Sequence, residues 1–180
     1  MKKLSLLLII LITNFISCNG HTPPPPPVPE KTAVEFGMSM GIGWNLGNQL
    51  DAHINGVSGE TFWGNQEATQ QTFNNVKKAG FRSVRIPVTW WPHMDNVYDA
   101  TIDKVWLDRI EEGVGYCQKA GLYCIINVHH DAHAHEDQGG QWIYADTESY
   151  ENITKGFQNV WKQIALRFKN YDAKVLFEGY

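Results

Sequence analysis

The sequence lacks an excess of basic residues, a long hydrophobic run and any recognisable cofactor motif. Its 180 residues carry 15 Lys and Arg against 19 Asp and Glu, which gives a formal net charge of −4. Nucleic-acid-binding domains usually present a basic patch, so the composition argues against a nucleic-acid partner. The apolar run from Leu4 to Ile12 is shorter than the ~20 residues that a membrane-spanning helix needs. We therefore predict neither a transmembrane helix in this run nor a bound cofactor.

Cysteine is also scarce, with three residues in the chain: Cys18, Cys117 and Cys124. Cys117 falls late in a predicted helix, and Cys124 lies inside the next predicted strand. An exported protein can form a disulfide between such residues. We prefer free buried thiols, because a free Cys often behaves as a small hydrophobic residue.

The N-terminus has the pattern of an export signal. Lys2 and Lys3 precede the short apolar run, and Ser17-Cys18 follows it. Such a segment is removed before folding. The small residue before Cys18 resembles a bacterial lipoprotein cleavage site, so we predict a signal peptide over 1–17 and lipidation of Cys18. The chain would then be an outer-membrane or cell-surface lipoprotein of a bacterium, held by its lipid anchor. Ordinary cleavage, leaving a periplasmic or secreted protein, is the alternative.

A proline-rich tether is expected over residues 18–33. Five consecutive prolines, Pro23 to Pro27, form its centre. Such a run adopts an extended polyproline II conformation and acts as a spacer. The folded domain is expected to occupy residues 34–180.

Two segments, 77–88 and 118–129, repeat the same pattern: Lys and Ala end a helix, Gly follows, and an apolar strand begins. Gly80 and Gly121 suit the left-handed turn after a helix. Apolar periodicity predicts helices over 69–79, over 105–117 after a cap at Asp103, and over 153–168; strands are predicted at 40–45, 81–88, 122–129 and 175–180. This alternation indicates an α/β fold with a parallel sheet.

Period-two alternation assigns the strand faces. Arg85, Asn127 and His129 are expected on one face, while Val84 and Ile126 turn toward the helices. Both central strands therefore place a polar group at the end of their inner face. This agreement favours a barrel over a doubly wound sheet.

Histidines gather after the third predicted strand, at His129, His130, His133 and His135, with Asp131 among them. His and carboxylate are common zinc ligands. Adjacent residues on a strand point to opposite faces, however, so His129 and His130 are not expected to share a metal. We therefore predict no metal site.

Arg85 near the end of an apolar strand needs a partner, because a buried Arg is rarely left unpaired. Glu178 on the fourth predicted strand has the matching parity, and it could pair with Arg85 or with Arg82. In the functional interpretation, Arg85 instead holds and polarises a carboxylate of the site.

Four motifs resemble glycoside hydrolase family 5, the cellulase family of (β/α)8 TIM barrels. They are residues 43–52 (GWNLGNQLDA), 82–90 (RSVRIPVTW), 126–131 (INVHHD) and 176–180 (LFEGY), in the family's order and spacing. The resemblance implies the first half of such a barrel, with about four strands and three helices.

The resemblance also implies a retaining mechanism, in which an acid/base Glu and a nucleophilic Glu lie ~5–5.5 Å apart. Neither family motif for these two Glu occurs in the 180 residues, so no catalytic residue is assigned. Arg85 would hydrogen-bond the nucleophile, and His129 would line the subsite of the reacting sugar. The remaining candidates for substrate binding are Asn45, Asn48, His130, Trp63 and Trp90, the last two by stacking on sugars or, equally, by packing.

The function expected from this resemblance is endo-hydrolysis of β-1,4-glycosidic bonds in a plant β-glucan. A β-mannanase or xylanase of the same family is one alternative, because specificity lies in the barrel loops. A tethered, non-catalytic glycan-binding lipoprotein is the other. The 180-residue chain alone is expected to be inactive and poorly soluble, with strand edges unpaired.

Overall fold

A computed structural model provides the structure and describes residues 31–96, 99–131, 142–143 and 150–179. The chain divides into two units, 1–30 and 31–180, and only the second is described. The predicted signal peptide, Cys18, the tether up to residue 30, and both His133 and His135 lie outside the described residues.

The domain is built on a four-stranded sheet in the order β1-β4-β5-β6, in which every neighbouring pair is parallel. The strands are β1 (Gly43–Asn45), β4 (Ser83–Ile86), β5 (Tyr123–Asn127) and β6 (Val175–Glu178). The intervening helices are α2 (Gln70–Lys78), α3 (Lys104–Lys119) and α4 (Tyr150–Phe168). The predicted alternation of four strands and three helices is confirmed.

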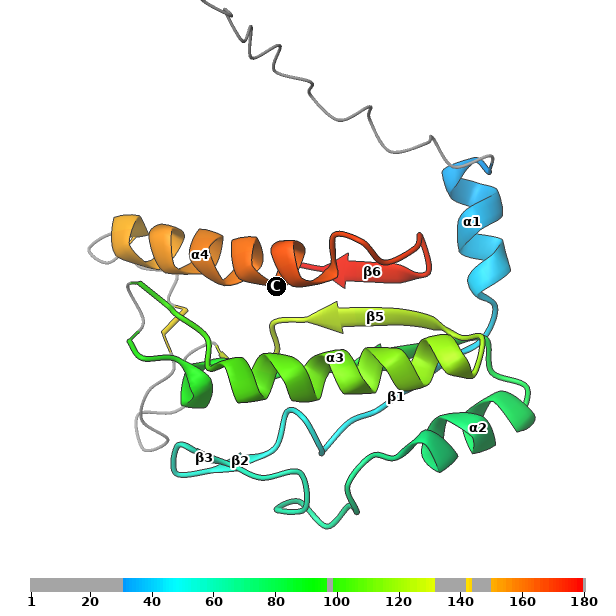
Figure 1. Cartoon of the computed structure of the whole chain (residues 1–180), viewed down its shortest axis with the longest axis horizontal. Coiled ribbons are helices and arrows are strands. Elements are labelled where there is room, and N and C mark those ends of the chain that lie inside the picture. The colour runs from blue at the N-terminus through cyan, green and yellow to red at the C-terminus, as the bar shows by residue number, and fades with distance from the viewer. Residues whose placement is uncertain (1–30, 97–98, 132–141, 144–149, 180) are drawn as a thin grey trace, which may run out of the picture. The chain divides into compact units, whose positions relative to one another are not determined.

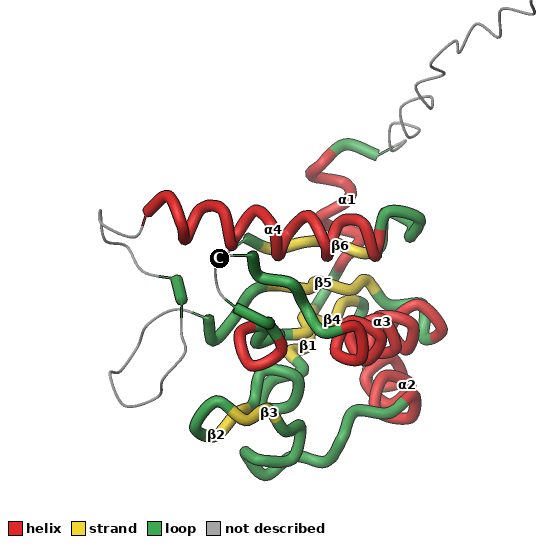
Figure 2. Tube along the Cα trace, turned by 60° about the vertical axis from the view of Figure 1, so that its left-hand side comes forward, coloured by secondary structure: helices red, strands yellow, loops and turns green. Residues whose placement is uncertain are grey.

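The helices pack on one face of the sheet, and Figure 2 shows α2 and α3 on the same side of the strands. Each helix turns an apolar stripe to the sheet, since Phe73, Ile110 and Ile164 are fully buried. These stripes meet the alternate residues of the strands. Val84, Ile86, Val88, Cys124, Ile126 and Val128 are all buried in this core.

The opposite face of the sheet carries Arg85, Tyr123 and Ile125, which are all half-buried. The predicted assignment of faces is therefore confirmed for β4 and β5. Cys117 and Cys124 lie in the core as free cysteines, as expected.

Three elements were not predicted: helix α1 (Ala33–Met40), the hairpin of β2 (His53–Ile54) and β3 (Val57–Ser58), and the short 3-10 helix η1 (Trp91–His93). The prediction of a strand over 40–45 was too long, because Met40 ends α1 and β1 begins at Gly43.

A capping box starts α1: the Thr32 hydroxyl accepts from the Glu35 N–H at 3.3 Å, and the Glu35 carboxylate accepts from the Thr32 N–H at 2.8 Å. The Thr-x-x-Glu signal was present in the sequence.

Helix α1 lies at the amino-terminal end of β5, as Figure 1 shows. Phe36 packs edge-on against the Tyr123 ring, and the Ser39 hydroxyl lies 2.7 Å from the Tyr123 hydroxyl. The hairpin belongs to the segment that follows β1. Helix α1 therefore lies at the amino-terminal end of the strands, and the β2–β3 hairpin belongs to the loop at their carboxyl end.

Helix ends follow the expected chemistry. The Asp103 carboxylate accepts from the Val105 N–H at 2.9 Å and caps α3. Gly80 and Gly121 adopt φ values of 100° and 69° after α2 and α3, where a side chain would be strained. Within the described residues, no helix combines the length and apolarity needed to cross a membrane.

His93 and Trp106 form a stacked pair at the edge of the core. Their ring centroids lie 3.8 Å apart and their planes differ by 7°. The His93 Nε2 is buried without a hydrogen-bond partner. Burial lowers the pKa of His93 to about 4, and the smaller opposing effect is the charge of Asp103.

His93 should make the domain less stable in acid. An unfolded His binds a proton below about pH 6.5, whereas folded His93 resists protonation down to about pH 4. The free energy of unfolding should therefore fall as pH drops through this window. We expect His93→Phe, which keeps a flat ring on Trp106, to lose less stability than the wild type between pH 7 and pH 4, measured as the urea midpoint. Equal losses in the two proteins would contradict this assignment.

Candidate active site at the carboxyl ends of the strands

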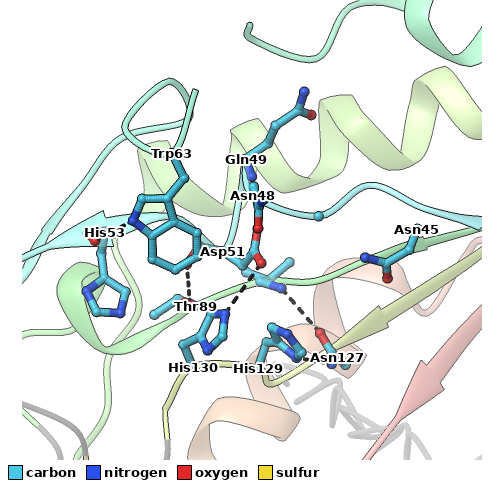
Figure 3. A network of polar contacts seen from close by, with 12 residues as sticks. Asn45, Asn48, Gln49, Asp51, His53, Trp63, Thr89, Asn127, His129 and His130 are labelled. Atoms are coloured by element: carbon cyan, nitrogen blue, oxygen red, sulfur yellow. Dashed lines mark hydrogen bonds and ion pairs between the residues drawn. The ribbon is translucent and has the colours of Figure 1, made fainter. Parts of the chain in front are cut away.

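Polar side chains collect where the parallel strands end. Asn45 ends β1, Arg85 lies near the end of β4, Asn127 ends β5 and Glu178 ends β6. The carboxyl ends of parallel strands share one edge of the sheet, which is where α/β proteins bind ligands. The loops after β1 and β5 add Asp51, His129 and His130 to this edge (Figure 3).

Arg85 forms a two-point ion pair with Glu178. Its Nε lies 2.7 Å from Oε2 and its Nη2 lies 2.8 Å from Oε1. The third donor, Nη1, contacts the Asn45 Oδ1 at 3.2 Å. Hydrogen bonding to Arg85 lowers the pKa of Glu178 despite some burial. The predicted partner of Arg85 is confirmed, and the guanidinium links three strands.

Asn127 is a buried amide that connects neighbouring strands. Its Oδ1 accepts from the Val88 N–H at 3.2 Å, and its Nδ2 lies 3.2 Å from the His129 Nδ1. Asn127 also faces Glu178 across the β5–β6 pair, and a hydrogen bond from Asn127 helps to lower the pKa of Glu178. Asn127, the last residue of β5, therefore holds the His129 ring in place.

His129 and His130 lie side by side, with ring centroids 4.3 Å apart (Figure 3). The expectation that they point to opposite faces was wrong. Strand β5 ends at Asn127, so strict alternation no longer applies two residues later. His130 Nε2 also approaches Asp51 Oδ2 at 3.5 Å. Ligand-capable atoms of Asp51, His129 and His130 all lie within 4.8 Å of one another.

Asp51 is the buried carboxylate of this cluster. Its Oδ1 accepts from the Gln49 N–H at 2.9 Å, and its carbonyl accepts from the Thr89 hydroxyl at 2.9 Å. Burial acts to raise the pKa of Asp51, but the contacts with His130 and the Gln49 N–H outweigh it and hold the pKa below its usual value. Asp51 therefore supplies a negative charge next to the two imidazoles.

Asp131 anchors the loops around the site. Its fully buried carboxylate accepts from the Trp90 N–H at 3.0 Å, the Trp91 N–H at 2.8 Å and the Trp142 Nε1 at 2.9 Å. Burial raises the pKa of Asp131 to about 6, although these donors favour the ionised form. One carboxylate thus joins the segment after β4 to the segment after β5.

Trp63 stands at the exposed rim of the site. Its indole packs edge-on against His130 at 5.3 Å, its Nε1 donates to the His53 carbonyl at 3.1 Å, and 37% of the residue is exposed. An exposed indole with a fixed orientation can stack on an apolar ligand face. The His53 ring lies 5.7 Å from the Trp63 ring and 5.5 Å from the Trp91 ring, between centroids.

Trp90, by contrast, is fully buried. Its Nε1 donates to the Asn127 carbonyl at 2.9 Å. A ring without exposed surface cannot stack on a sugar, so the structure favours the packing alternative for Trp90 and contradicts direct stacking. Trp90 contributes to the site through this hydrogen bond to the backbone of Asn127.

The two predicted asparagines occupy different positions. Asn45 reaches Arg85 and belongs to the polar edge. Asn48 is exposed, with a φ of 65°, and its carbonyl lies 3.4 Å from the Asn65 Nδ2. Asn48 therefore shapes the turn after β1, since Asn tolerates the left-handed region better than most residues.

Sequence reasoning missed Asp51, His53 and Trp91 as members of this cluster. Asp51 was present in the motif of residues 43–52, but its distance in sequence from the histidines gave no sign of contact. The polar residues that follow the first strand could have indicated Asp51, because the loop after a parallel strand lies at the same sheet edge as the loops after its neighbours.

A profile of the family described as Cellulase (glycosyl hydrolase family 5) matches residues 47–180. The chain belongs to glycosyl hydrolase family 5. Endoglucanase A of Paenibacillus barcinonensis is 39% identical over 148 residues, which are 82% of this chain and 36% of that protein. Endoglucanase A of Ruminococcus albus is 39% identical over 153 residues, 84% of this chain and 40% of that protein.

Solved family 5 structures share this fold. A Bacteroidetes-affiliated family 5 cellulase linked with a polysaccharide utilization locus matches with a TM-score of 0.77 at 50% identity, over 83% of this chain and 41% of that one. A Prevotella bryantii family 5 enzyme in complex with a xyloglucan tetradecasaccharide matches with a TM-score of 0.74 at 41% identity, over 82% and 42%. The chain thus spans well under half the length of these relatives.

Membership of the family confirms the resemblance seen in the four motifs. The family of glycosidases and the α/β fold with a parallel sheet are established by these matches and by the strand pairing. The individual roles predicted for Arg85, His129 and Asn45 remain predictions.

Asp131→Asn should destabilise the domain by about 1–3 kcal/mol, because the new amide nitrogen would face an N–H group and leave it unsatisfied in the core. Denaturant unfolding at pH 7.5 measures the change. Asp99→Asn is a matched control: Asp99 is mostly exposed and pairs with Lys155 at the surface, so its loss should cost well under about 1 kcal/mol. Equal effects of the two substitutions would contradict the anchoring role of Asp131.

Proposed function

We propose that the protein carrying this chain is an endo-acting β-1,4-glucanase that works with retention of configuration on a plant polysaccharide. The observation that supports this most is the line of Asn45, Arg85 and His129 at one sheet edge with the exposed Trp63 at its rim. This arrangement can hold a sugar chain by hydrogen bonds and by stacking.

The complete fold in this proposal is a (β/α)8 barrel, of which the described residues form the first part. The match spans about 40% of the length of the solved relatives, which supports a partial barrel in this chain. The outer edges of β1 and β6 are the places where the other strands of the barrel would pair.

Chemistry in this proposal uses two glutamates that the four matched motifs do not contain. One would protonate the leaving oxygen and the other would attack the anomeric carbon. Arg85 would hydrogen-bond the nucleophile and keep it ionised through the second N–H of Nη1, which contacts Asn45 rather than Glu178. His129 would donate to a hydroxyl of the reacting sugar.

The substrate class follows from the relatives by analogy. The two relatives named above are endoglucanases, and one solved relative holds a xyloglucan oligosaccharide. We propose a β-1,4-glucan or xyloglucan as the substrate, with mannan or xylan as the alternative.

The central experiment is an assay of the protein that carries this chain on carboxymethyl-cellulose, xyloglucan, mannan and xylan, by reducing-end release and viscosity. We expect cleavage of the glucans with a rapid fall in viscosity, and no cleavage by the isolated 180-residue chain. His129→Ala should lower kcat/KM by about 2- to 10-fold, the value of one neutral hydrogen bond. Cleavage of mannan or xylan without cleavage of the glucans would show that the substrate is mannan or xylan instead of a β-glucan.

A tethered glycan-binding lipoprotein is the second candidate, and the exposed Trp63 beside His130 favours it. Affinity electrophoresis with the same polysaccharides separates the two functions. Retardation without hydrolysis supports binding alone, whereas hydrolysis supports the enzyme.

We also propose the N-terminal lipid anchor at Cys18 and a position at the bacterial outer membrane or cell surface, supported by the sequence pattern before Cys18. Mass spectrometry of the mature protein should find a diacylglyceryl group on Cys18, and Cys18→Ser should release the protein from membranes. An unmodified Cys18 would show that the mature protein is periplasmic or secreted instead.

A further inference from the structure

We propose that Asn127 is a positioning residue that holds His129 in the tautomer whose Nε2 carries the proton, so that Nε2–H is presented to the substrate. The inference deepens the proposed function and rests on it for the nature of the ligand. The tautomer itself is a property of the described residues and can be tested without substrate.

The orientation of the Asn127 amide is determined by the backbone of the neighbouring strand. The Val88 N–H is a donor, and it lies 3.2 Å from Oδ1 in a site where Asn127 is only 2% exposed. Turning the amide over would place two donors against each other in the core, which costs the full desolvation of both. Oδ1 therefore faces Val88, and Nδ2 faces away from it.

This orientation makes Nδ2 the donor toward His129. The Nδ2–Nδ1 distance is 3.2 Å, and an amide NH2 can only donate. The His129 Nδ1 must then be the acceptor and carry no proton. In a neutral imidazole the proton is consequently on Nε2, on the other side of the ring from Asn127.

The surroundings keep His129 neutral, so that the choice of tautomer matters. Burial lowers the pKa of His129, and electrostatic interactions with His130 and Arg85 lower it further. Asp51 and Glu178 oppose this only in part. His129 therefore acts as a directed hydrogen-bond donor rather than as a cation.

The same tautomer argues against a metal at the cluster of Asp51, His129 and His130. Their ligand-capable atoms lie within 4.8 Å, but a metal needs an unprotonated ring nitrogen. On His129 the unprotonated Nδ1 is already occupied by Asn127. His129 is thus set to donate from Nε2 to a neutral polar ligand such as a sugar hydroxyl.

The decisive measurement is the ¹⁵N NMR pattern of the His129 ring in the full protein. We expect a protonated Nε2 and an unprotonated Nδ1 in the wild type at neutral pH. Asn127→Asp places an oxygen where Nδ2 was, so it should accept a proton from Nδ1 and reverse the pattern. Asn45→Asp is the matched control: it adds a carboxylate beside Arg85 without touching His129, and it should leave the pattern unchanged.

Kinetics test whether the tautomer matters for the reaction. We expect Asn127→Asp to lower kcat/KM on xyloglucan by about 2- to 10-fold. Because the new carboxylate faces Glu178, the comparison is repeated in a Glu178→Gln background. In a His129→Gln background the same substitution should cost less than about twofold, since a residue acting through His129 has nothing left to orient.

The outcomes separate this inference from the proposed function. A wild-type His129 protonated on Nδ1, or a pattern unaffected by Asn127→Asp, would overturn the inference even if the protein is an active glucanase. An equal kinetic loss with and without His129 would also overturn it, by showing a purely structural role. Absence of any hydrolysis would refute the proposed function alone, because the NMR result stands without it.

Discussion

The parallel pairing of β4, β5 and β6 is the constraint on which the rest of the structure depends. The register aligns Arg85 with Ile125 and Asn127 with Glu178. Parallel strands end at one edge, so a polar residue near the end of each strand meets its neighbours there. The site is a consequence of this register, and a slip by one residue would send Arg85 into the apolar core.

Buried polar groups then tie the loops to that edge. Asn127 accepts from the β4 side and donates to His129, while Asp131 collects donors from the segments around Trp90 and Trp142. Burying such groups is tolerated only when each is hydrogen-bonded. These bonds tie the described residues around Val88, Trp90, His129 and Trp142 to the edge of the sheet.

Two acidic side chains at this edge each have a basic side chain or an imidazole beside them. Arg85 and Glu178 neutralise each other on the inner face, and Asp51 lies next to His130. The neutral His129 is placed between these two pairs. In the proposed function this leaves the centre of the site with directed donors and a guanidinium ready for a further carboxylate, which is the environment a retaining glycosidase needs.

The sequence by itself determined the α/β alternation, the faces of β4 and β5 and the family, because local periodicity and contiguous motifs carry that information. It offered Glu178 as a partner for Arg85 or Arg82, and the structure decided for Arg85. Only the tertiary structure decided which distant groups meet. Asp51 joined the histidines, Trp90 entered the core, and His129 and His130 came side by side. Loops set these contacts, and the conformation of a loop follows no periodic pattern that could be read from the sequence.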